Sequence, residues 1–201
     1  MKVLDLFCGL GGWSIPFIED GDDVTGIDII AVKTKNDSYP GKLIVQDIRT
    51  VDGNDFKDYD LIIGSPPCNE FSIAKEKAIG AHPDICKRDV EKGLELVREY
   101  ERVIREAQPR YWAMENVSKL ADYYDKTPSW YFMVSKGGKR CLWSNFTIPL
   151  SPQFRFKRKI RDIYGWDNTR PLRAKIPYEI ARFIADVVKD VPFDAEKGKK
   201  E

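Results

Sequence analysis

The residues whose types are best suited to catalysis lie at the end of an apolar run, in the sequence SPPC at positions 65–68. The two prolines restrict the backbone and hold the next side chain, Cys68, in a set direction. A thiol held in this way near the start of a helix can have a lowered pKa and act as a nucleophile. A second apolar run ends in MENV at 114–117, and its carboxylate, Glu115, would share an edge with Cys68. The alternatives are a buried structural cysteine, which most lone cysteines are, and a solvent-facing loop acid.

A glycine-rich turn, DLFCGLGG at positions 5–12, follows the first apolar run of the chain. It does not have the Gly-Lys-Ser/Thr ending of a phosphate-binding loop or the GxGxxG spacing of a dinucleotide loop. Glycines there let the backbone turn tightly and let a ligand approach the main chain. Asp28 ends the second run and could accept both ribose hydroxyls, and Asp47 follows the third and could bond an adenine amino group. Each acid alone is more often a cap or turn residue, but in this order they favour S-adenosylmethionine.

These sites require elements that bring them to one edge. Strands that alternate with helices predict a parallel α/β sheet with crossover helices, whose functional loops lie at the carboxyl ends of the strands. The predicted strands are Lys2–Phe7, Asp23–Ile29, Lys42–Val45, Asp60–Gly64 and Arg110–Met114. The predicted helices are Gly11–Asp20, Asp89–Ala107 and Pro177–Val188. Lys139–Ile148 indicates a strand or hairpin, whereas the basic and aromatic stretch Ser151–Asn168 is ambiguous.

Composition narrows the class of protein. The 201 residues are 42% hydrophobic and 32% charged, which is typical of a folded domain. No apolar run approaches the ~18 residues of a membrane span, and no signal-peptide pattern precedes the first strand, so we expect a cytoplasmic protein. The four cysteines lack metal-ligand spacing and His82 is the only histidine, so neither a zinc site nor a histidine-dependent triad is expected.

Charge is unevenly distributed along a chain whose formal net charge is +1. Residues 135–182 contain twelve Lys and Arg and three acids. This bias predicts a local site for a polyanion, although a solvated basic surface would give the same pattern.

Together, DLFCGLGG, SPPCNEFS and MENV resemble motifs of the DNA cytosine-5 methyltransferase family, over about residues 1–117 with weaker continuation to Val188. The resemblance implies a Rossmann-like fold with a mostly parallel, doubly wound sheet. It also implies S-adenosylmethionine as cofactor and DNA methylation of the restriction-modification kind. The cofactor contacts that it implies are Phe7, Gly9, Leu10, Asp28, Asp47 and Pro67.

The family's chemistry assigns roles to particular residues. Cys68 would add to carbon 6 of cytosine, and Glu115 would bond N3 and the exocyclic amine. Arg140 would contact the cytosine carbonyl, with Arg155 as the competing choice. The target base would leave the helix to reach Cys68, and the segment Asn69–Arg88 would be the loop that closes over it.

The chain also departs from the family. No large target-recognition domain fits between Arg140 and the last helix, Asn69 and Glu70 replace a usual glutamine and proline, and the last helix lacks the usual Gly-Asn-Ser start. We therefore expect one S-adenosylmethionine-dependent domain over residues 1–190, a polar tail over 191–201, and a partner protein or homodimer that could supply recognition. The residues expected to hold DNA phosphates are Arg155, Lys157 and Arg158. The alternatives are the same chemistry on RNA and a non-catalytic nucleic-acid-binding relative, although a binding module needs neither Cys68 nor Glu115.

Overall fold

The computed structural model describes residues 1–82, 87–133, 139–149 and 175–190. In these residues a seven-stranded sheet has the strand order β3-β2-β1-β4-β5-β7-β6. The strands are β1 (Lys2–Leu6), β2 (Asp23–Asp28), β3 (Lys42–Val45), β4 (Leu61–Gly64), β5 (Tyr111–Val117), β6 (Trp130–Met133) and β7 (Lys139–Ser144). The first five are parallel, whereas β7 runs antiparallel to β5 and β6 antiparallel to β7. The predicted mostly parallel α/β sheet is therefore confirmed.

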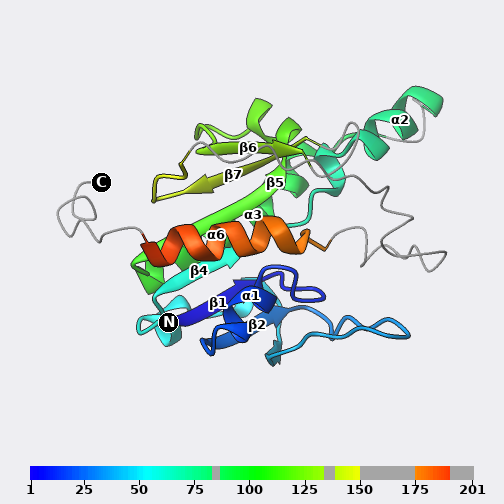
Figure 1. Ribbon diagram of the computed structural model, residues 1–201. Coiled ribbons are helices and arrows are strands. Elements are labelled where there is room, and N and C mark those ends of the chain that lie inside the picture. The colour runs from blue at the N-terminus through cyan, green and yellow to red at the C-terminus, as the bar shows by residue number, and fades with distance from the viewer. Residues whose placement is uncertain (83–86, 134–138, 150–174, 191–201) are drawn as a thin grey trace.

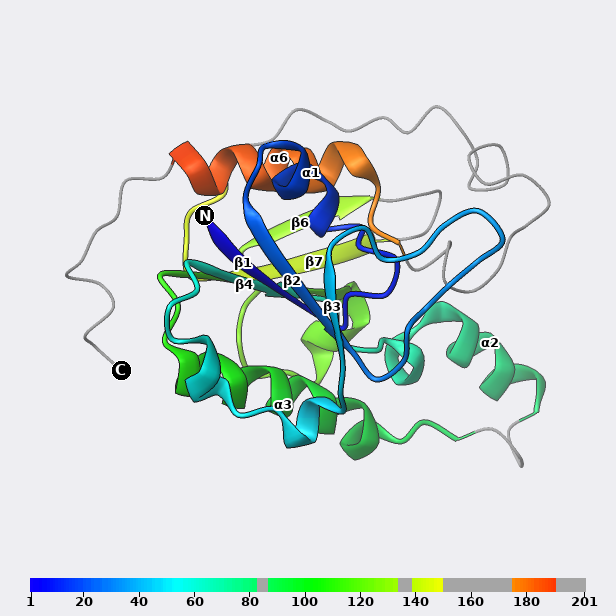
Figure 2. The same ribbon diagram turned by 90° about the horizontal axis from the view of Figure 1, so that it is seen from below.

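Helices cover both faces of the sheet (Figures 1 and 2). The helices α1 (Ser14–Glu19) and α6 (Tyr178–Asp190) lie together on one face, and α3 (Val90–Ala107) lies on the other. Two short 3₁₀ helices between β3 and β4, η1 (Ile48–Thr50) and η2 (Gly53–Phe56), pack beside α3. This three-layer arrangement leaves the carboxyl ends of the parallel strands along one edge.

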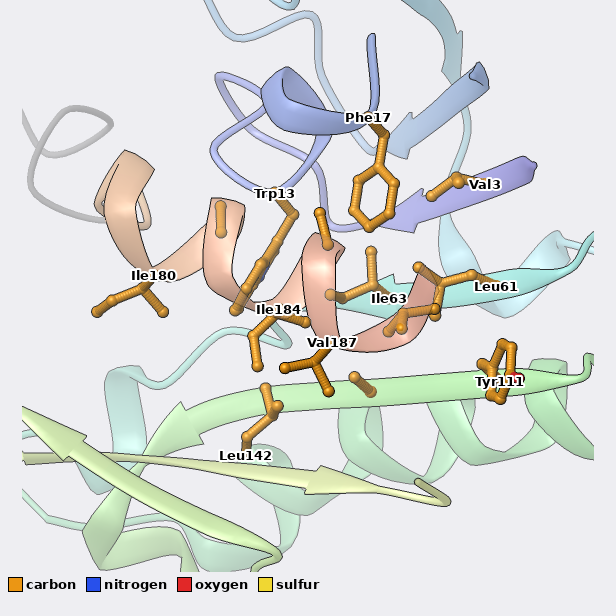
Figure 3. Packing of buried hydrophobic residues seen from close by; sticks show 14 of the residues in the cluster. Val3, Trp13, Phe17, Leu61, Ile63, Tyr111, Leu142, Ile180, Ile184 and Val187 are labelled. Carbon is orange, nitrogen blue, oxygen red and sulfur yellow. The ribbon is translucent and has the colours of Figure 1, made fainter. Parts of the chain in front are cut away.

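The α6 helix forms because its apolar residues recur on one face. Its buried side chains, spaced three and four residues apart, are Ile180, Ala181, Ile184, Ala185, Val187 and Val188. They pack with Trp13 and Phe17 and with the sheet residues Leu61 and Ile63 in one apolar cluster (Figure 3). Burial of each large aliphatic side chain stabilises the fold by roughly 1.5–3 kcal/mol, so this face of α6 is sufficient to hold the helix on the sheet.

The α3 helix carries a second apolar stripe onto the opposite face, with Val97, Tyr100 and Val103 buried. Asp89 caps its first turn by accepting a hydrogen bond from the backbone N–H of Lys92 at 3.0 Å. The helix ends at Ala107, and the cap residue that follows, Gln108, has a left-handed backbone conformation with φ of 51°. Prediction of this helix from its periodicity is confirmed to within one residue at its start.

Several boundaries differ from the sequence prediction. The segment Asn69–Arg88 was expected to be a loop, but it contains η3 (Asn69–Phe71) and the helix α2 (Ile73–Ala81). The fifth strand extends three residues beyond its predicted end, to Val117. β6 was not predicted, and it forms the outer strand against β7. The short helix η4 (Ser118–Asp122) follows β5 directly.

Among the described residues, no helix is long and apolar enough to cross a membrane. Three parts of the sequence prediction lie outside the described residues: the ambiguous stretch 151–168, the phosphate contacts Arg155, Lys157 and Arg158, and the tail 191–201.

Candidate active site at the carboxyl ends of the strands

The sheet order brings the predicted site residues to one edge in succession. From one side to the other, β2 ends in Asp28, β1 leads into the glycine loop, β4 leads into Cys68 and β5 carries Glu115. The chain order of neighbouring strands reverses between β1 and β4, which is the point where open α/β sheets form a binding crevice. The glycine loop and the cysteine turn therefore flank the position at which this fold places ligands.

The turn that carries Cys68 is anchored by the neighbouring strand. Asn116, buried in β5, donates a hydrogen bond from Nδ2 to the carbonyl oxygen of Pro66 at 2.9 Å. Cys68 is half-buried and stands directly before η3. Pro66 has no backbone N–H, so its carbonyl oxygen is the backbone group through which a hydrogen bond can hold this residue of the SPPC turn. Sequence reasoning did not assign a role to Asn116, although its place beside Glu115 was a signal.

Glu115 and Arg140 form an ion pair at this edge. Glu115 Oε1 lies 2.6 Å from Arg140 Nη1, and the two side chains are 1% and 16% exposed. The pair results from the antiparallel register of β5 and β7, in which Arg140 faces Val117, two residues beyond Glu115. Glu115 thus lies within a strand rather than at a solvent-facing loop, and it is a buried carboxylate with a compensating cation.

The electrostatics of Cys68 differ from the sequence expectation. Burial raises the pKa of the Cys68 thiol, while the positive charge of Arg140 lowers it and the negative charge of Glu115 raises it. The expectation of a lowered pKa is wrong because η3 has only three residues and desolvation of the thiolate outweighs the cation. Glu115 in turn raises the pKa of Arg140, so the guanidinium stays charged. Cys68, Glu115 and Arg140 consequently form one electrostatic unit.

The glycine loop and Asp28 are joined directly. The backbone N–H of Gly9 donates to Asp28 Oδ2 at 2.9 Å, whereas the contact that the described residues offer Asp28 Oδ1 is a long one of 3.4 Å with the N–H of Ile30. Gly9 has φ of 52°, and a Cβ built on it would meet no atom within 4 Å in the part of the chain that the structure describes. The loop therefore borders open space, with a carboxylate oxygen that retains capacity for a further donor.

The other residues predicted to contact a cofactor are placed differently. Phe7 is half-buried with φ of 57°, Pro67 is exposed, and the side chain of Leu10 is buried, so only the backbone of Leu10 is suited to meet a ligand. Asp47 caps η1 and forms an ion pair with Arg49 at 2.5 Å. An adenine amino group would thus share the Asp47 carboxylate with Arg49.

Sequence reasoning missed an apolar surface beside the two acids. Ile29, Ile30 and Val45 are 59%, 60% and 56% exposed, and Val45 is the register partner of Asp28. Exposed aliphatic residues grouped beside a hydrogen-bonding carboxylate are typical of the wall of a ligand site. The signal in the sequence was the apolar pair that directly follows Asp28.

A hydrogen-bonded group lies beneath the glycine loop. Ser14 Oγ donates to Asp5 Oδ2 at 2.6 Å and lies 2.8 Å from the hydroxyl oxygen of Tyr39. Burial raises the pKa of Asp5 to about 7. Trp13, on the same loop, donates from Nε1 to Ser65 Oγ at 3.0 Å, which links the glycine loop to the turn before Cys68. None of these contacts was visible as a motif, because each joins residues from different elements.

Comparisons with known proteins match much of the chain to one family. A family model described as C-5 cytosine-specific DNA methylase matches residues 1–131. The Type II methyltransferase M.XorII of Xanthomonas oryzae pv. oryzae is 30% identical over 129 residues, which cover 58% of this chain and 28% of that protein. The Type II methyltransferase M1.ScrFI of Lactococcus lactis subsp. cremoris is 34% identical over 123 residues, covering 59% and 29%. The matched part thus spans less than a third of the length of these two relatives.

A solved structure shows the same fold. It is a crystal structure of a prophage-encoded protein from E. coli described as a DNA modification methyltransferase, with a TM-score of 0.52 and 20% identity. The match covers 82% of this chain and 54% of that chain.

Proposed function

Because this chain belongs to the C-5 cytosine-specific DNA methylase family, we propose that it methylates carbon 5 of cytosine in DNA through a covalent adduct with Cys68. The observation that carries the proposal is the grouping of Cys68 with the buried Glu115–Arg140 pair, across the strand-order reversal from the glycine loop. A thiol nucleophile, a carboxylate and a guanidinium are the three groups that this chemistry requires at a cytosine ring.

S-adenosylmethionine fits the residues on the other side of that reversal. Asp28 retains an oxygen that can accept from a ribose hydroxyl, Gly9 borders open space, and Ile29, Ile30 and Val45 offer an apolar wall for a flat base. We assign the cofactor contacts to Phe7, Gly9, Leu10, Asp28, Asp47 and Pro67, with Asp47 sharing its carboxylate between Arg49 and the base. When bound, the cofactor supplies an electrophilic methyl group.

The protein's own residues perform the activation of the base. The Cys68 thiolate adds its sulfur lone pair to carbon 6, which places electron density on carbon 5. Because burial raises the pKa of Cys68, the nearby Arg140 charge provides the main electrostatic support for the thiolate. As negative charge develops on N3, that ring nitrogen takes up a proton from solvent, and its N–H and the exocyclic amine both donate hydrogen bonds to the Glu115 carboxylate. After methylation, water takes the proton from carbon 5, and the electron pair of that C–H bond forms the double bond to carbon 6 as the Cys68 thiolate leaves. N3 then returns its proton to solvent, which restores the neutral aromatic base.

Arg140 is the arginine that we assign to the cytosine carbonyl. It lies 2.6 Å from Glu115, so a base held by Glu115 would also be within reach of its guanidinium. Arg155, the competing choice, lies outside the described residues. The same holds for Lys157 and Arg158, which stay predicted phosphate contacts.

A methyl-transfer assay tests the proposal. Purified protein is incubated with tritiated S-adenosylmethionine and either duplex DNA or RNA of matched sequence, followed by digestion and nucleoside analysis. We expect label in 5-methyldeoxycytidine, and no label with the matched Cys68→Ser variant. Label in RNA alone would assign the same chemistry to RNA, and label on an exocyclic amine would refute the proposed mechanism. Binding of DNA without any transfer would favour the non-catalytic alternative.

A further inference from the structure

Glu70 lies two residues after Cys68 and connects the cysteine turn to a different part of the chain. Its Oε2 accepts a hydrogen bond from the backbone N–H of Asp89 at 3.0 Å and forms an ion pair with Lys75 Nζ, also at 3.0 Å. The side chain is 14% exposed. Since Asp89 is the cap residue of α3, the Glu70 carboxylate joins η3 to the first turn of that helix.

A second set of contacts closes around the same point. Arg88 donates from Nη1 to the carbonyl oxygen of Glu70, and its guanidinium lies over the ring of Tyr123, 5.8 Å from the centroid. Tyr123 packs on Phe71 with ring centroids 5.7 Å apart, and Phe71 is buried. The contacts therefore link three segments in a closed ring. These are η3, the residues that precede α3, and the residue that follows η4.

The α3 helix approaches η3 closely enough to require a glycine. A Cβ built on Gly93 would lie 2.5 Å from the ring of Phe71 and 3.0 Å from Glu70 Cβ. A real Cβ would therefore force the two elements apart. The close approach lets the Glu70 carboxylate reach the Asp89 N–H, and the two elements are held as one unit.

This unit includes the backbone of Cys68. The N–H of Phe71 donates to the carbonyl oxygen of Cys68 at 3.0 Å, so a shift of η3 would be transmitted to the cysteine. On the preceding side, Asn116 holds the carbonyl of Pro66. Cys68 is thus fixed from both sides, by β5 before it and by α3 after it.

The path of the chain explains why η3 needs a contact with the residues that precede α3. Helix α2, which is capped by Ser72, lies away from the sheet in both ribbon views (Figures 1 and 2), and Arg88, later in the chain, contacts Glu70 again. The residues before α2 and those before α3 are joined by Glu70 and the ring described above.

We propose that Glu70 is a positioning residue for Cys68, which fixes the direction of the thiol by fastening η3 to the N-terminus of α3. This inference rests on the proposed function, since it assigns Glu70 a role in the addition of Cys68 to the base. Neither the charge nor the carboxylate of Glu70 takes part in the chemistry itself. Its contribution is to the geometry of the attacking sulfur.

The test compares Glu70→Ala with Glu70→Gln and with Glu91→Ala, a control that removes an exposed carboxylate from the first turn of α3. DNA that contains 5-fluorocytosine traps the Cys68 adduct, and the rate of its formation is measured in a single turnover with S-adenosylmethionine. We expect Glu70→Ala to slow trapping by about tenfold, which is a smaller loss of rate than a ~1 Å displacement of a reacting group can cause. Affinities for DNA and cofactor should stay within about twofold of wild type, because neither ligand meets the Glu70 carboxylate in this assignment.

The conservative variant separates positioning from folding. The amide oxygen of Glu70→Gln can still accept from the Asp89 N–H, so most of the trapping rate should return, while Glu91→Ala should match wild type. Hydrogen exchange of the Asp89 amide should accelerate in Glu70→Ala and less in Glu70→Gln. Wild-type trapping rates in Glu70→Ala would overturn the inference. A parallel loss of trapping, ligand affinity and melting temperature in both Glu70 variants would also overturn it, because it would show a structural role only. Failure of the proposed function is distinguishable, because the wild-type protein would then form no adduct.

Discussion

Replacement of Arg140 by methionine tests the buried ion pair at the centre of the site. The change keeps an apolar stem of similar length and removes the guanidinium that lies 2.6 Å from Glu115. It leaves a carboxylate that is 1% exposed without its cation. Removal of one partner from a buried pair costs about 3–5 kcal/mol, and the 16% exposure of Arg140 places the expected loss near the lower end, at about 3 kcal/mol. The measurement is the free energy of unfolding from urea titration at pH 7.

The double variant Glu115→Gln/Arg140→Met shows where the cost arises. Because the second substitution removes the uncompensated charge, the double variant should be more stable than Arg140→Met alone. Arg98→Met provides a matched control: Arg98 pairs with Glu91 at 2.8 Å, but the two side chains are 58% and 75% exposed, so no measurable change is expected. Wild-type stability in Arg140→Met, or a double variant less stable than either single one, would refute this account of the pair.

Three further predictions concern the cofactor, the thiol and the nucleic acid. Asp28→Ala should weaken binding of S-adenosylmethionine by roughly tenfold in calorimetry, the loss of one or two hydrogen bonds to a charged acceptor, and unchanged affinity would sink the assignment. Because burial raises the pKa of Cys68, its alkylation should have a midpoint above the ~8.5 of a free thiol, and Arg140→Met should move that midpoint higher still, since Arg140 lowers this pKa. A midpoint at or below that of a free thiol would contradict the electrostatic account. If the basic stretch holds about six phosphates, the affinity for duplex DNA should fall with salt concentration at a log–log slope of about −5. Joint charge reversal at Arg155, Lys157 and Arg158 should lower the affinity for DNA of every sequence to the same extent. Tight, salt-independent recognition of a long target site would refute that prediction.

The central strands could be predicted because buried parallel strands are short, continuous apolar runs with clear ends. β3 was predicted at its observed bounds, and β1, β2 and β4 to within one residue at an end. The edge strand β6 was missed because its pairing depends on β7, a partner that the local pattern of Trp130–Met133 does not specify. β5 was predicted too short because Glu115 and Asn116 are polar, although both are buried in the folded protein.

The segment after the cysteine shows why local composition misleads. Its polar residues and Gly80 favoured a loop, but Ser72 caps α2 by accepting a hydrogen bond from the N–H of Lys75 at 3.2 Å. α2 has no strong apolar stripe, so periodicity did not mark it. The capping serine was the one local signal for this helix.

Candidate site residues could be identified from motif order, but their electrostatics could not. The direction of the Cys68 pKa depends on its burial and on Arg140, which comes from a strand 72 positions later in the chain. The positioning role proposed for Glu70 likewise depends on its contact with Asp89, which comes after the whole of α2 in the chain. Both properties arise from tertiary contacts that no single stretch of sequence contains.

The identity of the nucleophile is the central claim, and trapping followed by peptide mapping tests it most directly. Wild-type protein and the Cys68→Ser variant are incubated with S-adenosylmethionine and duplex DNA that contains 5-fluorocytosine, in which fluorine blocks the final elimination. A serine hydroxyl is a far weaker nucleophile than a thiolate at neutral pH, so the variant should keep its fold and cofactor binding but form no adduct. We predict a covalent DNA adduct in wild type alone, mapped to the peptide that contains Cys68. An adduct on Cys8, Cys86 or Cys141, or one that persists in Cys68→Ser, would contradict the account.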